Sequence, residues 1–229
     1  MKYEIIIFDA DETLFDFKKS EREALKNAMS EFGVDYDENY HLKIYKPINS
    51  AMWTKLEKGL ITQEKLKTER FKIFFDKLNL NFDKDEFASS YMRHLSNASF
   101  LYDNSVEVLS KLSKHYKLLI ITNGLSLVQS KRIKDSSVSH FFEKIIISED
   151  IGISKPNPYI FEHTLRDVEY SNKSKIIIVG DSLSSDIQGG INFGIDTCWF
   201  NPNSLANTKD IKPTYEIDNL MGLSELIEL

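Results

Sequence analysis

Two carboxylates follow an apolar run close to the start of the chain. Asp9 and Asp11 come directly after residues 5–8, a continuous apolar run that is typical of a buried central strand in a parallel sheet. Open α/β sheets bind their ligands beyond the carboxyl ends of such strands. Because carboxylates removed from water are costly unless a cation shares them, this pair predicts a cation-binding site.

Polar residues also follow later apolar runs. Thr122 and Asn123 end one such run, Asp181 follows another, and Lys155 lies between them in the chain. Carboxylate oxygens, completed by substrate phosphate and water, are the usual ligands of Mg²⁺, and a lysine adds a compact positive charge. These residues therefore predict a joint phosphate and metal site.

Taken one at a time, these residues have ordinary explanations. An Asp after a strand can cap the next helix, a lone Lys is usually solvated, and Thr-Asn-Gly is a common turn. If each residue had only its ordinary explanation, however, their occurrence at successive strand ends would be a series of coincidences. The joint pattern therefore favours catalysis.

The elements that must position these side chains form an alternating pattern. Short apolar runs bounded by turn residues predict strands at residues 5–8, 118–122, 144–147, 175–179 and 196–200. Helical segments alternate with the last four of these strands. Such alternation predicts parallel βαβ units, and therefore an α/β fold with a parallel sheet.

A helical insert interrupts this core. Residues 17–98 contain helical stripes of apolar residues, and Ser20 and Asp83, each followed three residues later by Glu, predict helix N-termini. The predicted organisation is a core of residues 1–16 and 99–229 with a helical insert of residues 17–98.

Composition narrows the class of protein. The chain has 229 residues, a formal net charge of -6 and no block of Lys and Arg, which argues against a nucleic-acid polymer or an anionic membrane as partner. No apolar stretch approaches the roughly 18 residues of a membrane span, and no cleavage site follows the N-terminal apolar run. Cys198 is the sole cysteine, so an intrachain disulfide is impossible and a reducing cytoplasm is expected.

The order of the motifs carries a family resemblance. The chain resembles the haloacid dehalogenase (HAD) superfamily through Asp9-Ala10-Asp11-Glu12-Thr13, Thr122-Asn123, Lys155-Pro156 and Gly180-Asp181 with Asp186. Within that superfamily it is most similar to bacterial pyrimidine 5′-nucleotidases, which share the DADETLF start and the ITNG turn. The resemblance extends over nearly the whole chain and implies a Rossmann-like core with an α-helical cap inserted after the first motif.

The resemblance implies a two-step phosphatase reaction. Asp9 would attack phosphorus and form an aspartyl-phosphate, and Asp11 would protonate the leaving oxygen and then activate water. Mg²⁺ is expected on the Asp9 side chain, the Asp11 backbone carbonyl and the Asp181 side chain, where it offsets the repulsion between two anions.

The other motif residues receive supporting roles from the same resemblance. Thr122 and the backbone N–H of Asn123 would grip phosphate oxygens, and Lys155 would stabilise both Asp9 and the charge that develops on the phosphoryl group. Asp186 would orient Lys155 or a metal-bound water.

Substrate choice is expected to depend on the insert. Asn49 and Trp53 match an Asn and Trp pair of the nucleotidase family and lie close enough in sequence to share a helical face. Our hypothesis is that Asn49 reads the pyrimidine edge and Trp53 encloses the base; the alternative for Trp53 is a buried structural anchor. The expected substrates are dUMP, dTMP and UMP, and the expected state is a monomer.

Three classes of function compete. A Mg²⁺-dependent nucleoside 5′-monophosphate phosphatase is favoured by Asp11 and by the family resemblance. The alternatives are phosphatase or phosphomutase chemistry on a sugar phosphate or other small phosphomonoester, and a non-enzymatic binding protein. A carbon-halogen hydrolase is disfavoured because it has no need of Asp11.

Overall fold

The computed structural model describes residues 2–227, apart from the side chain of residue 57. The chain divides into two compact units. The first contains the chain up to Phe17 and from Ser99 onward, and the second contains Lys18–Ala98.

The first unit is built on one sheet of six parallel strands in the order β3-β2-β1-β4-β5-β6. The strands are β1 (Ile5–Phe8), β2 (Lys117–Thr122), β3 (Phe142–Ile147), β4 (Ile176–Gly180), β5 (Asp196–Phe200) and β6 (Tyr215–Ile217). The predicted α/β class and parallel sheet are confirmed. β6, which has three residues, was not predicted.

The central strand explains why the sheet is covered on both faces. All four residues of β1 are fully buried: Ile6 and Phe8 contribute to one hydrophobic core, and Ile5 and Ile7 contribute to the other. Alternate side chains of a strand point to opposite faces, and burying each such side chain contributes about 1.5–3 kcal/mol. An apolar run without alternation therefore requires helices on both sides of the sheet.

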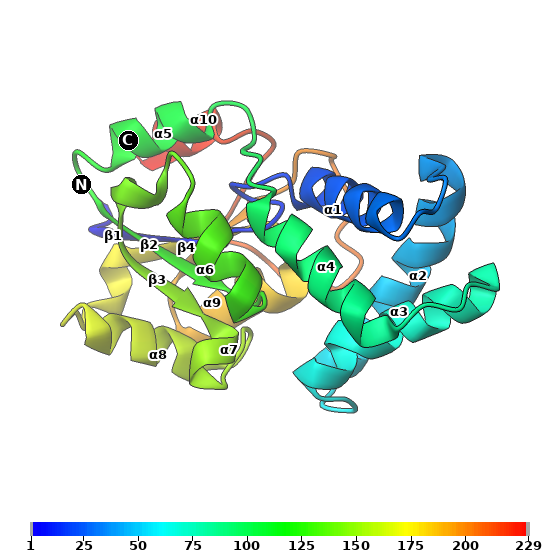
Figure 1. Ribbon diagram of the computed structural model, residues 1–229. Helices are drawn as coiled ribbons and strands as arrows, with labels where there is room; N and C mark the ends of the chain where they lie inside the picture. Colours follow the sequence, from blue (N-terminus) through cyan, green and yellow to red (C-terminus); the bar gives the residue numbers. More distant parts are fainter. Residues whose placement is uncertain (1, 228–229) are drawn as a thin grey trace. The chain divides into compact units, whose positions relative to one another are not determined.

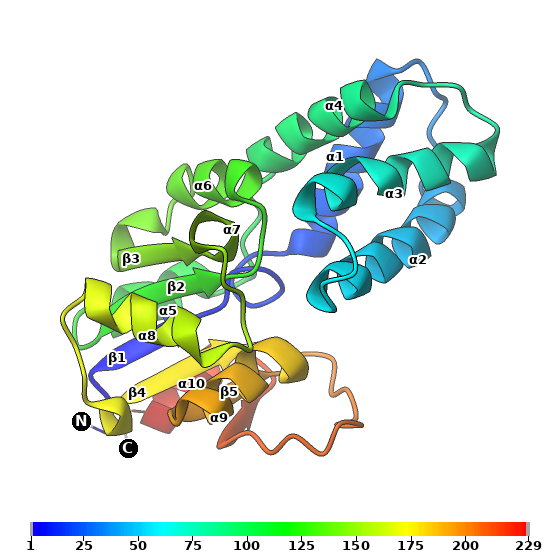
Figure 2. The ribbon, with the colours of Figure 1, turned by 90° about the horizontal axis from the view of Figure 1, so that it is seen from below.

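Those helices pack on opposite faces of the sheet (Figure 1). Side chains of α5 (Ser105–Leu112) and α10 (Met221–Ile227) join the core of Ile6 and Phe8. Side chains of α8 (Pro158–Asp167) and α9 (Gln188–Phe193) join the other core, and Figure 2 shows these two helices in front of the sheet.

Shorter elements follow the strands that carry the predicted motifs. They are α6 (Ser126–Lys134) after β2, α7 (Ser148–Ile151) after β3 and a π-helical turn (Leu183–Ile187) after β4. Two 3₁₀ turns, Ser139–Phe141 and Lys173–Lys175, directly precede β3 and β4. The loops at the carboxyl ends of β1, β2 and β4 therefore hold most of the predicted site residues.

The second unit is helical. It contains α2 (Glu38–Glu57), α3 (Gln63–Leu78), α4 (Lys84–Asn97) and all of α1 (Phe17–Glu31) except its first residue. An aromatic cluster joins three of these helices: Tyr45 of α2 stacks on Phe71 of α3 with ring centroids 5.8 Å apart, and Phe71 meets Phe87 of α4 edge to face at 5.0 Å. Such pairs add about 0.5–1.5 kcal/mol to the gain from burial.

The two predicted helix starts have different outcomes. Asp83 caps α4 as predicted, because its Oδ1 accepts hydrogen bonds from the backbone N–H groups of Asp85 and Glu86 at 2.8 and 2.9 Å. The prediction for Ser20 is wrong, since α1 begins at Phe17 and Ser20 is buried inside the helix. The residues before Ser20 include two lysines, which are good helix formers, so nothing local stops the helix from extending backward.

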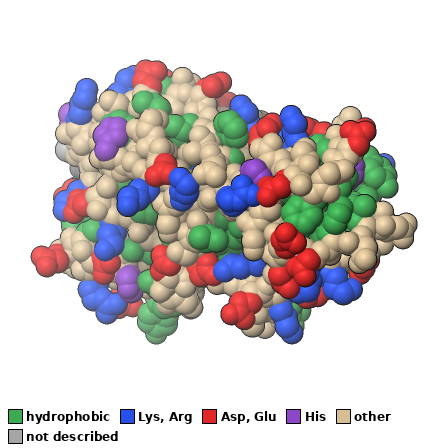
Figure 3. Space-filling view, viewed as in Figure 1, with side chains coloured by type: hydrophobic (Ala, Val, Ile, Leu, Met, Phe, Trp, Pro, Cys, Tyr) green, Lys and Arg blue, Asp and Glu red, His purple; other side chains and the backbone are tan. Residues whose placement is uncertain are grey.

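Charged side chains of both signs are interspersed on the face that Figure 3 shows. None of the helices within residues 2–227 is both long enough and apolar enough to cross a membrane.

Candidate active site

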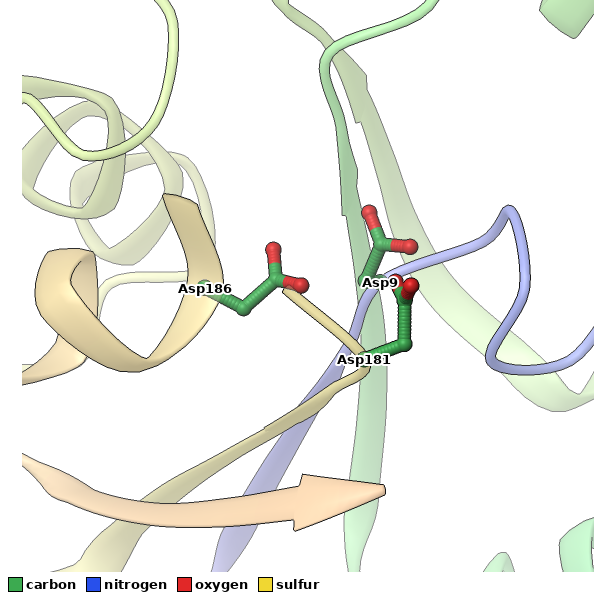
Figure 4. Close-up of side chains that lie close together, drawn as sticks. All are labelled: Asp9, Asp181 and Asp186. Atoms are coloured by element: carbon green, nitrogen blue, oxygen red, sulfur yellow. The ribbon is translucent and has the colours of Figure 1, made fainter. Parts of the chain in front are cut away.

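Two neighbouring strands bring the first carboxylates together. Asp9 follows β1 and Asp181 follows β4, and the backbone N–H of Asp9 donates to the carbonyl of Val179 at 2.9 Å. These strands adjoin where the strand order reverses, which is the usual ligand position in an open α/β sheet. Asp186 projects from the π-helical turn, and one carboxylate oxygen from each Asp lies within 4.8 Å of the others (Figure 4).

Asp186 is fixed by its own loop. Its Oδ2 accepts from the backbone N–H of Ser182 at 2.9 Å, and its Oδ1 accepts from the Ser185 hydroxyl at 3.1 Å. A Cβ on Gly180 would lie 2.4 Å from the Asp186 carboxyl carbon. Only glycine therefore allows this carboxylate to fold back over the end of β4.

Lys155 connects two of the three carboxylates. Its Nζ lies 2.6 Å from Asp9 Oδ1 and 2.7 Å from Asp186 Oδ1, and it donates to the Ile121 carbonyl at 2.5 Å. Burial alone would lower the pKa of Lys155, but the charges of Asp186 and Asp9 hold that pKa above its usual value. Lys155 is therefore a cation that stays protonated and is held against the Asp9 carboxylate.

One lysine does not neutralise three acids. Burial, reinforced by the charges of Asp186 and Asp9, raises the pKa of Asp181 to about 8. Burial also raises the pKa of Asp9 to about 6, although Lys155 opposes the rise. No side chain of the described residues donates a hydrogen bond to the Asp181 carboxylate. The excess of hard, buried oxygen donors fits a divalent cation, which would lower the cost of keeping these acids ionised.

Thr13 and Trp199 hold the backbone around this cluster. The Thr13 hydroxyl lies 3.5 Å from Asp9 Oδ2 and accepts from the Asp181 backbone N–H at 3.1 Å. The Trp199 indole N–H donates to the Asp181 carbonyl at 2.8 Å. These contacts join the loop after β1, the loop after β4 and strand β5, so the distance between Asp9 and Asp181 is held from several sides.

The two residues at the end of β2 face the same region. The Asn123 amide bonds the backbone of Lys155 in both directions, with Nδ2 to the carbonyl and Oδ1 from the N–H, each at 2.9 Å. Thr122 Oγ1 accepts from the backbone N–H of Gly124 at 3.3 Å and from Gln129 Nε2 at 3.0 Å. Two accepted bonds leave the hydroxyl proton of Thr122 to donate elsewhere.

The Asp11 side chain has different partners from Asp9. Its Oδ2 accepts from Gln129 Nε2 at 2.6 Å, and its Oδ1 forms an ion pair with Arg132. Sequence reasoning missed Gln129 and Arg132. The available signal was their position in α6, where they share helical spacing with the buried Val128 and Ile133, so that polar groups fall on an apolar face.

The turn that follows Asp11 shows what Glu12 contacts. Glu12 has a φ of 62°, in the left-handed region, and its Oε2 accepts from the Tyr102 hydroxyl at 3.2 Å. Left-handed backbone is uncommon for a residue with a side chain and is found where the surroundings enforce it. Here the contact with Tyr102 helps to hold the turn directly after Asp11.

The predicted substrate residues lie in the other unit. Asn49 donates from Nδ2 to Glu21 Oε1 at 2.7 Å and accepts at Oδ1 from Arg70 Nη1 at 2.8 Å, while Trp53, also on α2, is half-buried. Recognition of a base by Asn49 stays a prediction. Besides these two bonds, its amide has a second N–H to donate and a second carbonyl lone pair to accept. Asp9, Asp11, Thr122, Asn123, Lys155, Asp181 and Asp186 all lie in the first unit.

Known proteins resemble the chain over its whole length. It is 33% identical to the pyrimidine 5′-nucleotidase PynA of Streptococcus pneumoniae, covering 100% of this chain and 96% of that protein. It is 30% identical to the pyrimidine 5′-nucleotidase YjjG of Escherichia coli, with 99% of each covered. The magnesium-bound crystal structure of the HAD hydrolase YfnB from Bacillus subtilis matches with a TM-score of 0.93 at 33% identity, covering 100% of both chains. Residues 6–200 match the model of the haloacid dehalogenase-like hydrolases, so the resemblance seen in the motifs is confirmed and the chain belongs to that family.

Proposed function

We propose that the protein is a Mg²⁺-dependent 5′-nucleotidase that hydrolyses pyrimidine nucleoside monophosphates through an aspartyl-phosphate on Asp9. The observation that carries the proposal is the buried Asp9 carboxylate, which Lys155 holds through Oδ1 at 2.6 Å and which Asp11 follows two residues later. The relatives named as pyrimidine 5′-nucleotidases support the class of substrate.

Asp9 is suited to the role of nucleophile. Lys155 fixes Oδ1, while the one side chain of the described residues that bonds Oδ2 is Thr13, whose hydroxyl is 3.5 Å away, so Oδ2 is the oxygen that attacks. A bond forms between Oδ2 and phosphorus as the bond from phosphorus to the nucleoside oxygen breaks, and water later cleaves the aspartyl-phosphate. The ammonium of Lys155 and the hydroxyl of Thr122 stabilise charge on the phosphoryl oxygens, together with the backbone N–H of Asn123.

Asp11 moves the protons. It donates a proton to the departing nucleoside oxygen in the first step and accepts one from the attacking water in the second. Its side chain is 25% exposed, whereas that of Asp9 is 10% exposed, as expected for a group that exchanges protons with reactants and solvent.

The metal would be held by the Asp9 and Asp181 side chains and by the Asp11 carbonyl. When bound, Mg²⁺ would offset the repulsion between the anionic nucleophile and the anionic phosphate. Asp186 would act through Lys155, because its Oδ1 is already bound by that ammonium at 2.7 Å. The magnesium in the YfnB crystal structure supports this choice of ion.

The insert is proposed to select the base, with Trp53 enclosing it and Asn49 reading its edge. Trp53→Ala should then raise KM for a pyrimidine monophosphate more than KM for a phosphate ester that has no base. An equal change for both substrates would contradict a base contact.

We also propose that the protein is located in the reducing cytoplasm, as its composition predicts. Its single cysteine, Cys198, is buried. The monomeric state stays a prediction.

The decisive experiment is phosphate release from a panel of nucleoside 5′-monophosphates and sugar phosphates, with Mg²⁺ and with EDTA. We expect the highest kcat/KM for pyrimidine monophosphates, loss of activity in EDTA, and recovery when Mg²⁺ is added. A preference for sugar phosphates would reject the nucleotide but keep the chemistry. Absence of metal-dependent release from every substrate would reject the proposal.

A further inference from the structure

We propose that Gln129 and Arg132 are positioning residues for Asp11, holding its carboxylate in place for proton transfer. This inference rests on the proposed function, because it assigns a purpose to a contact made by the acid and base of that reaction. Both residues lie on α6, after the strand that ends in Thr122.

The three side chains form a directed hydrogen-bond chain. Arg132 donates to Gln129 Oε1 from Nη2 at 2.7 Å and from Nε at 3.3 Å. This pins the oxygen of the Gln129 amide toward the guanidinium and turns its nitrogen toward Asp11 Oδ2, at 2.6 Å, and Thr122 Oγ1, at 3.0 Å. Arg132 thus acts on Asp11 both directly, through the ion pair, and indirectly, through the orientation of Gln129.

The chain also links Asp11 to the phosphate-binding end of β2. One NH₂ group bonds both the proposed proton carrier and the hydroxyl proposed to grip phosphate. A carboxylate on a turn would otherwise move among staggered rotamers. General acid catalysis requires an oxygen within hydrogen-bond reach of the leaving group, so restricting those rotamers contributes directly to the rate.

Burying the Arg132 guanidinium at this position costs free energy. The residue is 0% exposed, Nη1 has no hydrogen-bond partner among the described residues, and the guanidinium lies 5.1 Å from the Phe15 ring and 5.2 Å from the Phe17 ring. Burial lowers the pKa of Arg132 to about 10. Apolar residues of similar volume commonly replace buried ion pairs without loss of stability, so packing alone does not account for a guanidinium here.

The test compares two leaving groups. A nucleoside oxygen needs a proton as it departs, whereas p-nitrophenolate departs without one, so kcat/KM for p-nitrophenyl phosphate is insensitive to the general acid. For Arg132→Met we expect kcat/KM on dUMP to fall about 100-fold, within the usual contribution of general acid-base catalysis, and kcat/KM on p-nitrophenyl phosphate to change by less than about threefold. On p-nitrophenyl phosphate kcat itself should fall, because the second step still needs Asp11 to activate water.

The matched control is Lys131→Met, one residue earlier on the same helix. Lys131 is exposed and pairs with Asp135 on the surface, so this variant should keep both activities. Arg132→Lys retains the charge but not the planar fork that orients Gln129, and it should recover part of the dUMP activity. Gln129→Met removes the donor to Thr122 as well as the donor to Asp11, so it should lower kcat/KM on both substrates, and more on dUMP than on p-nitrophenyl phosphate.

A double-mutant cycle with Asp11→Asn separates positioning from general damage to the fold. If Arg132 acts through Asp11, Arg132→Met should cause little further loss of dUMP activity in the Asp11→Asn background. Parallel losses on both substrates, additive losses in the cycle, or a gain in dUMP activity would overturn the inference. Failure of the proposed function is distinguishable, because wild-type protein would then fail to hydrolyse dUMP before any variant is compared.

Discussion

The two units bury charged side chains in opposite ways. In the helical unit, Glu21 and Arg70 are joined through the Asn49 amide by bonds of 2.7 and 2.8 Å, so one acid and one base share a bridge. In the sheet unit, three carboxylates gather around a single lysine, and the pKa of Asp181 rises to about 8 because of burial and of the neighbouring acids.

The difference separates a structural role from a functional one. In a balanced buried network, removing one charged partner is strongly destabilising, because the other charge is left uncompensated. An unbalanced cluster costs stability in the metal-free protein, and such perturbed groups are concentrated at functional sites. Substitutions in the sheet cluster should therefore change activity more than stability, whereas substitutions in the helical network should do the reverse.

The largest effect is expected for Asp9→Asn. An amide is a poor nucleophile, so kcat for phosphate release should fall by about 10³-fold or more. Circular dichroism and thermal unfolding should remain close to wild type, because the amide keeps the shape of the carboxyl group. Turnover near the wild-type rate would remove Asp9 from the mechanism.

The matching change in the helical unit is Arg70→Met. Arg70 is 2% exposed, and its loss removes the buried cation that donates to Asn49 Oδ1 at 2.8 Å. Breaking a buried pair from one side costs about 3–5 kcal/mol, which urea unfolding would measure. Arg93→Met is the control, because Arg93 pairs with Glu31 at the surface and should cost much less. Equal losses of unfolding free energy in the two variants would show that the buried network contributes no more to stability than the surface pair.

Asp181→Asn should stabilise the metal-free protein while removing the response to Mg²⁺. The folded pKa of about 8 lies above the ordinary 3.8, so the folded state binds the proton more tightly and stability falls as pH rises between those values. The variant should be more stable than wild type by about 1–3 kcal/mol above pH 8 and by little near pH 4. Thermal unfolding in EDTA at several pH values tests this. A rise in Tm with Mg²⁺ equal to that of wild type would contradict a metal contact by Asp181.

The smallest effect is expected at Glu31. Hydrogen bonds from Ser90, His94 and Arg93 lower its pKa to about 2, from an ordinary 4.5. A depressed folded pKa contributes stability above the ordinary value, and that stability is lost as pH falls toward 2. Glu31→Gln should therefore flatten the acid limb of a Tm profile recorded between pH 2 and 6. An unchanged acid limb would show that these surface bonds add nothing in solution.

Strand prediction shows how far local patterns reach. β1 to β5 were predicted within two residues of their observed ends, because an apolar run bounded by turn residues is a signal contained in the segment itself. Tyr215–Ile217 was missed because its pairing with β5, and not its own pattern, makes it a strand. Ser20 was wrongly read as a helix start because a capping pattern does not prevent the preceding residues from joining the helix.

Residue types at the strand ends were enough to indicate the chemistry. Asp9 and Asp181 supply carboxylates, which prefer hard cations, and Lys155 supplies an ammonium group. Parallel strands place their carboxyl ends at one edge of the sheet. The side chains that contact the site residues could not be predicted in this way. Asp11 meets Arg132 across 121 positions of the chain, and Asn49 meets Arg70 across 21. No local pattern specifies which distant side chains share a buried space, because that choice is made by the packing of whole helices against the sheet and against one another.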